Sequence, residues 1–114
     1  MIRGLHKAST VFVLTVGVIH TASTFFTYDS LNESAVWFAG AGLCGIFVAL
    51  LNMALWLPEA PALSRRSVAA ANFLFFFWLY ASVTAISGPM RLVMAATGAA
   101  MVITAPLLGR GKRG

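Results

Sequence analysis

The sequence predicts an all-α membrane protein with four transmembrane helices in an antiparallel up-down bundle. Three observations carry this prediction. Of the 114 residues, 60% are hydrophobic and only 10% are charged, four long apolar runs follow one another, and lysine and arginine gather at alternate connections. A chain of this length cannot bury so much apolar surface in a water-soluble core, so a soluble globular domain is not expected.

The four apolar runs define the predicted helices within one domain of residues 1–114. The hydrocarbon layer needs about 20 apolar residues per helix, and runs near this length predict helices at about 8–28, 34–57, 66–87 and 90–108. Every charged residue falls at or beyond the ends of these helices, because a charge at the bilayer centre is expensive to bury. The first run continues through bulky residues, which favours a membrane helix over a cleaved signal peptide.

The connections are short and contain helix-boundary residues. Ser30 and Glu33 have the S-x-x-E spacing of a capping box for the second helix. Ser64 is a candidate cap for the third helix, Gly88 can end it, and Pro89 can begin the fourth. Connections this short predict that neighbouring helices run antiparallel.

Basic residues are divided unequally between the two sides of the predicted bundle. The N-terminus, the connection after the second helix and the C-terminal tail carry seven of the eight, whereas Arg91 lies on the opposite side. The seven are Arg3, Lys7, Arg65, Arg66, Arg110, Lys112 and Arg113. Because cytoplasmic loops are enriched in lysine and arginine, we expect both termini on the cytoplasmic side of a bacterial-type inner membrane.

The net charge of +5 is explained by attraction of these helix ends to anionic lipid headgroups. We therefore expect the lipid bilayer as a partner and no nucleic acid. On the outer side, Asp29 and Glu33 are predicted to lie near Arg91. An exposed ion pair there would tie the outer ends together but contribute only about 0–1 kcal/mol.

Small residues form a stripe on the second predicted helix. Ala41, Gly45 and Ala49 recur at four-residue steps, and such small-xxx-small patterns let helix backbones approach closely in lipid. The pattern predicts a packing seam, either within the chain or between copies of it.

Two asparagines lie at matching depths in the second and third predicted helices. Asn52 and Asn72 are each ten residues from Ala62 in the intervening connection, so an antiparallel hairpin would bring them to the same level. We expect an interhelical hydrogen bond between them, with a ligand-facing role as the alternative.

His20 is the ionisable residue that lies deepest in the first predicted helix, and it shares a helix face with Thr24. Depth counting places Tyr80, Thr84 and Thr97 at the same level, so these side chains are candidate hydrogen-bond partners of the imidazole. Three roles stay open for His20: a packing residue with satisfied hydrogen bonds, a pocket for an amphiphile or quinone-like ligand, and a proton-coupled step.

No metal site is predicted, and any cofactor is left unassigned. His6 precedes the predicted helix 8–28 and would lie at the cytoplasmic boundary, where it cannot face His20. Cys44 is the single cysteine, so there is no intrachain disulfide and no C-x-x-C pattern. Glycine-rich phosphate loops and the common nucleophile motifs are absent from the sequence.

The outline of four helices in about 110 residues resembles the small multidrug resistance transporters. That resemblance implies a membrane-embedded carboxylate on the first helix, whereas here no aspartate or glutamate lies inside a predicted span. We therefore assign no family.

The function expected from the sequence is that of a non-enzymatic accessory or oligomer-forming membrane subunit. The alternative is a small-molecule binder or transporter with a pocket around His20. An enzyme is the least favoured class, since the embedded ionisable groups are limited to His20, Tyr80 and Cys44.

Overall fold

The computed structural model of the chain describes residues 1–85 and 88–108, with the side chains of 82–85, 90 and 91 outside this description. The described part is all-helical and contains the four helices that the apolar runs predict. They are α1 (Ile2–Thr27), α2 (Glu33–Met53) continued by the 3-10 turn η1 (Ala54–Trp56), α3 (Ala62–Ala85), and α4 (Met90–Thr104) continued by the 3-10 turn η2 (Ala105–Leu107).

Several helix ends differ from the predicted ones. α1 begins at Ile2, six residues before the predicted start at residue 8. The prediction used the start of the apolar run, but a helix can continue beyond the apolar run into polar residues. α3 likewise begins at Ala62 rather than near residue 66, which places Ser64 inside its first turn instead of at its cap. In both α1 and α3, the helix therefore begins with residues that precede the apolar run and include basic side chains.

The cap of α2 also differs from the predicted capping box. Asn32 is the N-cap residue, and its side-chain oxygen accepts a hydrogen bond from the Ala35 backbone N–H at 2.9 Å. Ser30 therefore does not cap the helix, and Glu33 is its first residue. Gly88, which was predicted to end the third helix, has φ at +115°, a conformation that glycine adopts readily. The residues 86–87 that separate it from Ala85 lie outside the described part of the chain.

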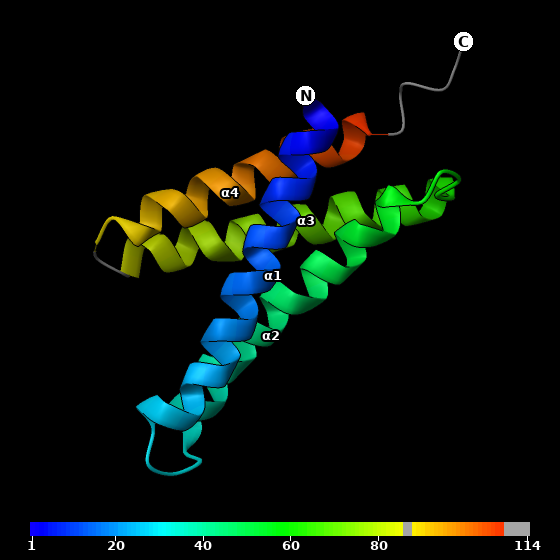
Figure 1. Cartoon of the computed structure of the whole chain (residues 1–114). Coiled ribbons are helices and arrows are strands. Elements are labelled where there is room, and N and C mark those ends of the chain that lie inside the picture. Colours follow the sequence, from blue (N-terminus) through cyan, green and yellow to red (C-terminus); the bar gives the residue numbers. More distant parts are fainter. Residues whose placement is uncertain (86–87, 109–114) are drawn as a thin grey trace.

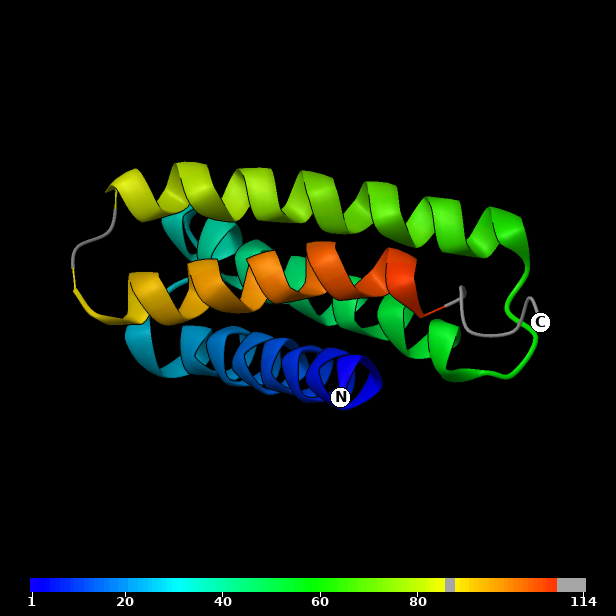
Figure 2. The same ribbon diagram turned by 90° about the horizontal axis from the view of Figure 1, so that it is seen from above.

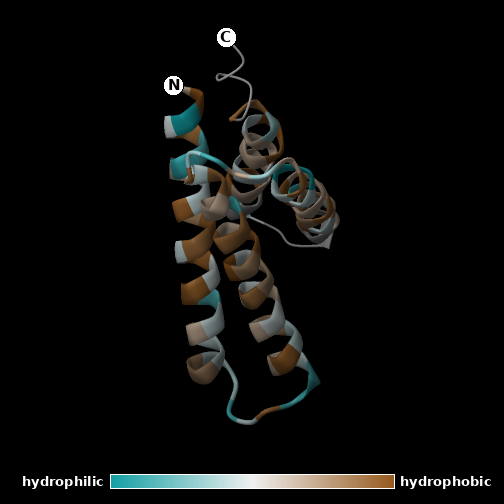
Figure 3. Cartoon of the chain, turned by 90° about the vertical axis from the view of Figure 1, so that its right-hand side faces the viewer, coloured by the Kyte–Doolittle hydropathy of each residue, from teal (hydrophilic) through white to brown (hydrophobic). Residues whose placement is uncertain are grey.

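The four helices form two antiparallel hairpins that cross each other obliquely. Figure 1 shows α1 and α2 running together toward one corner while α3 and α4 run together toward another. In Figure 3 the α1–α2 hairpin is seen lengthwise and the other hairpin nearly end-on. The chain is therefore antiparallel within each hairpin, as predicted, but its four axes do not align in one up-down bundle.

The α1–α2 hairpin is held by glycine contacts. A Cβ atom added at Gly17 would lie 2.8 Å from the Gly42 carbonyl oxygen, and one added at Gly42 would lie 2.7 Å from the Thr21 backbone nitrogen. Real Cβ atoms do not approach backbone atoms so closely, so these glycines permit the contact between the two helices.

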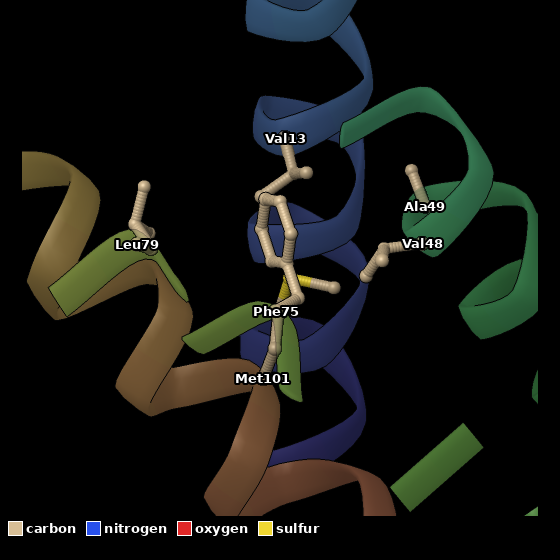
Figure 4. Packing of buried hydrophobic residues seen from close by; sticks show 6 residues of the cluster. All are labelled: Val13, Val48, Ala49, Phe75, Leu79 and Met101. Carbon is tan, nitrogen blue, oxygen red and sulfur yellow. The ribbon is translucent and has the colours of Figure 1, made fainter. Parts of the chain in front are cut away.

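The hairpins meet around a layered core. Figure 4 shows one apolar cluster in which all four helices contribute side chains that point toward one another. Its buried members are Val13, Val48, Ala49, Phe75, Leu79 and Met101. A second, smaller cluster lies nearer the α2–α3 connection and consists of Leu55, Val68 and Ala105. Asn52, Asn72 and Thr104 are buried polar residues that lie between the two clusters in sequence, after α2 and α4 reach the first cluster and before α3 does.

Apolar side chains cover much of the outside of the molecule. Within the described residues, two helical stretches are long and apolar enough to cross a membrane, Ile2–Thr27 and Glu33–Trp56, and Leu92–Leu107 is a shorter apolar helix. Within an 18-residue apolar window of each longer stretch, only 22% and 28% of the residues are buried inside the chain. Their apolar residues therefore mostly face outward, unlike those of a core helix in a soluble protein.

Candidate functional site

Four buried polar side chains, one from each helix, meet between the two apolar clusters. We call this group the polar junction. Its members are His6 on α1, Asn52 on α2, Asn72 on α3 and Thr104 on α4, and their exposed fractions are 0, 0, 1 and 2%. Polar groups this deeply buried require hydrogen-bond partners inside the protein, and most of them have one.

The two asparagines of the junction form a reciprocal pair. The Asn52 Nδ2 donates to Asn72 Oδ1 at 2.5 Å, and Asn72 Nδ2 donates to Asn52 Oδ1 at 2.9 Å. Each amide also donates to a backbone carbonyl, Asn52 to Val48 at 2.8 Å and Asn72 to Met101 at 3.3 Å. The pair therefore links α2 to α3 and connects α3 to α4, with both hydrogens of each amide engaged.

His6 and Thr104 link α1 to α4. The His6 Nδ1 lies 3.0 Å from the Thr104 hydroxyl oxygen, and that hydroxyl is 2.6 Å from the Ala100 carbonyl. The shorter distance to Ala100 favours the tautomer in which Nδ1 carries the ring proton and Thr104 accepts the hydrogen bond. In the other tautomer of the neutral ring, Thr104 donates to Nδ1.

The Nε2 atom of His6 is buried and has no hydrogen-bond partner in the described structure. The ring also lies beside the Asn52 backbone. Thr10 lies on the same side of α1 and donates to the His6 backbone carbonyl at 2.8 Å. A buried ring nitrogen without a side-chain partner thus lies where all four helices meet.

The chemistry available to the junction follows from its residue types. Its side chains are neutral amide, hydroxyl and imidazole groups, so they exchange hydrogen bonds without bringing a fixed charge into the helix core. No group of three or more histidine, cysteine, aspartate or glutamate side chains able to hold a metal ion occurs among the described residues. The arrangement is suited to positioning helices.

The sequence prediction missed two members of the junction. His6 was assigned to the cytoplasmic boundary because the apolar run begins after it, and Thr104 was not selected. A signal was present on α1, where His6, Thr10, Val13 and Gly17 are separated by four, three and four residues and all lie on the buried face. Extending the helical periodicity beyond the apolar run would have included His6.

His20 lies on the α1–α2 hairpin, away from the junction. Its ring stacks on Phe38 of α2, with 3.8 Å between ring centroids and 22° between ring planes. Thr24, which is buried, donates to the His20 backbone carbonyl at 3.4 Å. The imidazole is therefore paired with an aromatic ring of its own hairpin.

The other residues expected around His20 lie elsewhere. Tyr80 is exposed on α3, where its ring is near Phe76, and the Thr97 hydroxyl donates to the Val93 carbonyl on α4 at 2.8 Å. No described hydrogen bond or ring contact joins either residue to His20, and the Thr84 side chain lies outside the described residues. Depth counting fails here because the two hairpins diverge (Figure 1).

The small-residue stripe on α2 faces α1 within the chain. Ala49 is fully buried, and a Cβ at Gly45 would lie 3.6 Å from the Gly17 Cα, which is an ordinary contact. Ala41 is partly exposed, and the closest approach falls at its neighbour Gly42. At the N-terminal end of the stripe, the closest contact with α1 is thus at Gly42, one residue after the predicted Ala41.

The predicted ion pair on the outer side falls partly beyond the described residues. Asp29 and Glu33 are exposed near the α1–α2 turn, and neither forms an ion pair within the described part of the chain. The Arg91 side chain lies outside it. Figure 1 shows the α1–α2 turn well apart from the start of α4, where Arg91 is located. Cys44 is exposed on α2 as a free thiol.

Comparison of the chain with protein-family models, curated proteins and solved structures finds no match.

Proposed function

We propose that this chain is a small integral membrane protein that acts as a non-enzymatic accessory or oligomer-forming subunit. The observation that carries the proposal is the arrangement of the two hairpins. The two hairpins meet around the polar junction and diverge beyond it. Large apolar side chains on each hairpin are therefore not covered by the other hairpin. Exposed examples are Phe47 and Leu50 on α2, and Phe73, Leu74 and Phe77 on α3.

The exposed surface supports insertion into a membrane. Contiguous apolar patches of this extent are rare on soluble monomers, and Figure 3 shows hydrophilic residues concentrated at the N-terminal end of α1 and at the connections. At 1.5 Å per residue, the 26 residues of α1 reach beyond the roughly 30 Å of a hydrocarbon core. α3 and the shorter α4 would complete four spans, with the second hairpin tilted against the first.

The proposed topology has both termini in the cytoplasm of a cell with an inner membrane. Two features support it. Figure 2 shows the α2–α3 connection at one end of the molecule and the α1–α2 turn and the start of α4 toward the other, with the N-terminus between them. Arg3 donates to the Trp56 carbonyl at 3.1 Å, which joins the N-terminus to the end of α2. Seven basic residues then share the cytoplasmic side.

The polar junction supports a structural rather than a catalytic role. It is buried, it contains no fixed charge, and the His6–Thr104 and Asn52–Asn72 hydrogen bonds connect the two hairpins. A rigid crossing of this kind holds the apolar faces of the hairpins apart, where lipid and a neighbouring subunit can cover them. The alternative, a ligand pocket around His20, has less support because that ring is stacked on Phe38.

Native mass spectrometry of the full chain released from lipid nanodiscs tests the proposal. We expect complexes with two or more copies of the chain, or with a stoichiometric partner protein, and we expect them to persist on dilution. A dilution series of the same preparation is the control for nonspecific association. A single chain without partners at every concentration would contradict the assembly role.

A further inference from the structure

Two basic side chains on α1 are fixed against the end of α2. Arg3 and Lys7 are four residues apart and therefore lie on the same helix face. The Arg3 Nη2 donates to the Trp56 backbone carbonyl at 3.1 Å, and the Lys7 Nζ lies 5.3 Å from the centroid of the Trp56 ring. Both cations are thus held near one point at the proposed cytoplasmic end of the α1–α2 hairpin.

This cation pair has no carboxylate partner. Within residues 1–85 and 88–108, neither Arg3 nor Lys7 forms an ion pair, and Glu59 in the nearby connection is exposed and unpaired. The indole Nε1 of Trp56 is buried without a partner, so the two cations, rather than the indole N–H, are open to a ligand. Two close positive charges without a counter-charge attract an anion.

An exposed apolar stripe extends along α1 from this pair toward the opposite side of the membrane. Lys7, Val11, Val18 and Phe25 are separated by four, seven and seven residues, so they share one face. Val11 is 51% exposed, Val18 49% and Phe25 82%. A cation pair at one end of an apolar stripe complements an amphiphile with an anionic head and a hydrocarbon chain. A soluble anion would contact the cation pair but not the apolar stripe.

We propose that Arg3, Lys7 and Trp56 form a binding site for the headgroup of an anionic phospholipid, with an acyl chain along Val11 and Val18. The headgroup phosphate accepts charge-assisted hydrogen bonds from the Lys7 ammonium and from the guanidinium N–H groups that Arg3 does not use for Trp56. The indole ring lies at the level of the headgroups, where tryptophan is enriched. This inference rests on the membrane insertion proposed above.

Lipid retention tests the site. The purified full chain is reconstituted in vesicles of equal parts palmitoyl-oleoyl phosphatidylglycerol and phosphatidylcholine, extracted in mild detergent, and examined for bound lipid by native mass spectrometry. The two lipids have the same acyl chains, so a preference reports the headgroup. We expect the wild type to retain phosphatidylglycerol, and Lys7→Gln or Arg3→Gln to reduce the retained ratio about fivefold each.

Matched variants separate this site from a general charge effect. Arg91→Gln removes one positive charge at the start of α4, at the other end of the molecule, and we expect it to leave the ratio unchanged. Lys7→Arg keeps the charge and is expected to keep the preference. Thermal unfolding in detergent checks that each single variant is folded. If Arg3→Gln is unstable, the comparison of lipid retention between Lys7→Gln and Lys7→Arg decides the outcome.

Three results would overturn the inference. Equal retention of the two lipids by the wild type would indicate apolar contact without headgroup recognition. Release of phosphatidylglycerol by excess inorganic phosphate, without lipid exchange, would indicate a soluble-anion site. An equal loss of preference in Arg91→Gln would indicate net charge alone. The number of chains per complex is read from the same spectra, so the lipid site and the proposed assembly can fail separately.

Discussion

Replacing Asn72 with alanine tests how the polar junction holds the hairpins together. The substitution removes the two hydrogen bonds with Asn52 and the one to the Met101 carbonyl. Asn52 Nδ2 keeps its bond to Val48, and Met101 keeps a helical bond from the Ala105 N–H. The groups left without a partner are Asn52 Oδ1 and one of the two Asn52 Nδ2 hydrogens. Both belong to a side chain with no exposed surface.

The expected magnitude follows from these losses. Interhelical hydrogen bonds in membranes average about 0.6 kcal/mol and reach about 1.7 kcal/mol, and a buried unpaired polar group costs about 1–3 kcal/mol. Asn72→Ala should therefore lower the free energy of unfolding by about 2–3 kcal/mol. Reversible unfolding in mixed micelles of mild and denaturing detergent, followed by circular dichroism, measures it.

A double-mutant cycle makes the test specific to the pair. Asn52→Ala with Asn72→Ala leaves no side-chain amide unpaired, so the double variant should be about 1–2 kcal/mol more stable than the sum of the single effects predicts. Asn52→Leu with Asn72→Leu, which refills the volume with apolar atoms, should lie close to the wild type. Single effects that add to within about 0.5 kcal/mol would refute the reciprocal pair.

Three further predictions concern packing, protonation and topology. Gly42→Ala should lower the free energy of unfolding by about 1–3 kcal/mol, because the added Cβ would meet the α1 backbone. Gly40→Ala, whose added Cβ would meet no atom within 4 Å, should be neutral or slightly stabilising. Equal effects of the two substitutions would contradict the packing seam between α1 and α2. Nitrogen-15 shifts should place the proton of neutral His6 on Nδ1, and a proton on Nε2 would contradict the assignment of Thr104 as the acceptor of that hydrogen bond. A fluorescent protein fused to the C-terminus should fluoresce in the cytoplasm, and a phosphatase active only outside it should be inactive there.

The part of the fold that sequence reasoning predicted is the part determined by local patterns. Apolar run length predicted the four helices. The Asn52–Asn72 contact was also predicted, because both residues lie ten positions from Ala62 in the connection that joins their helices. Because each asparagine is so few residues from the connection, antiparallel α2 and α3 keep the two side chains at the same level even though the helices cross.

The hairpin crossing was not predictable in the same way. Crossing angles depend on which side chains interdigitate at the contact, and here the two hairpins meet through the shapes of shared core residues such as Phe75 and Met101. Depth counting assumes aligned helices, so its error grows with distance from the place where the hairpins meet. His20 lies far enough from that place for the error to change its neighbours, whereas His6 lies within it.

The crossed hairpins can be tested most directly by a distance measurement in lipid nanodiscs. In a Cys44→Ser background, spin labels at Ser30→Cys and Leu92→Cys report the separation between the α1–α2 turn and the start of α4. A second pair, Val18→Cys with Leu43→Cys, reports the spacing across one packed hairpin. The crossed arrangement predicts a clearly longer distance for the first pair than for the second. Equal distances, as a closed up-down bundle requires, would contradict it.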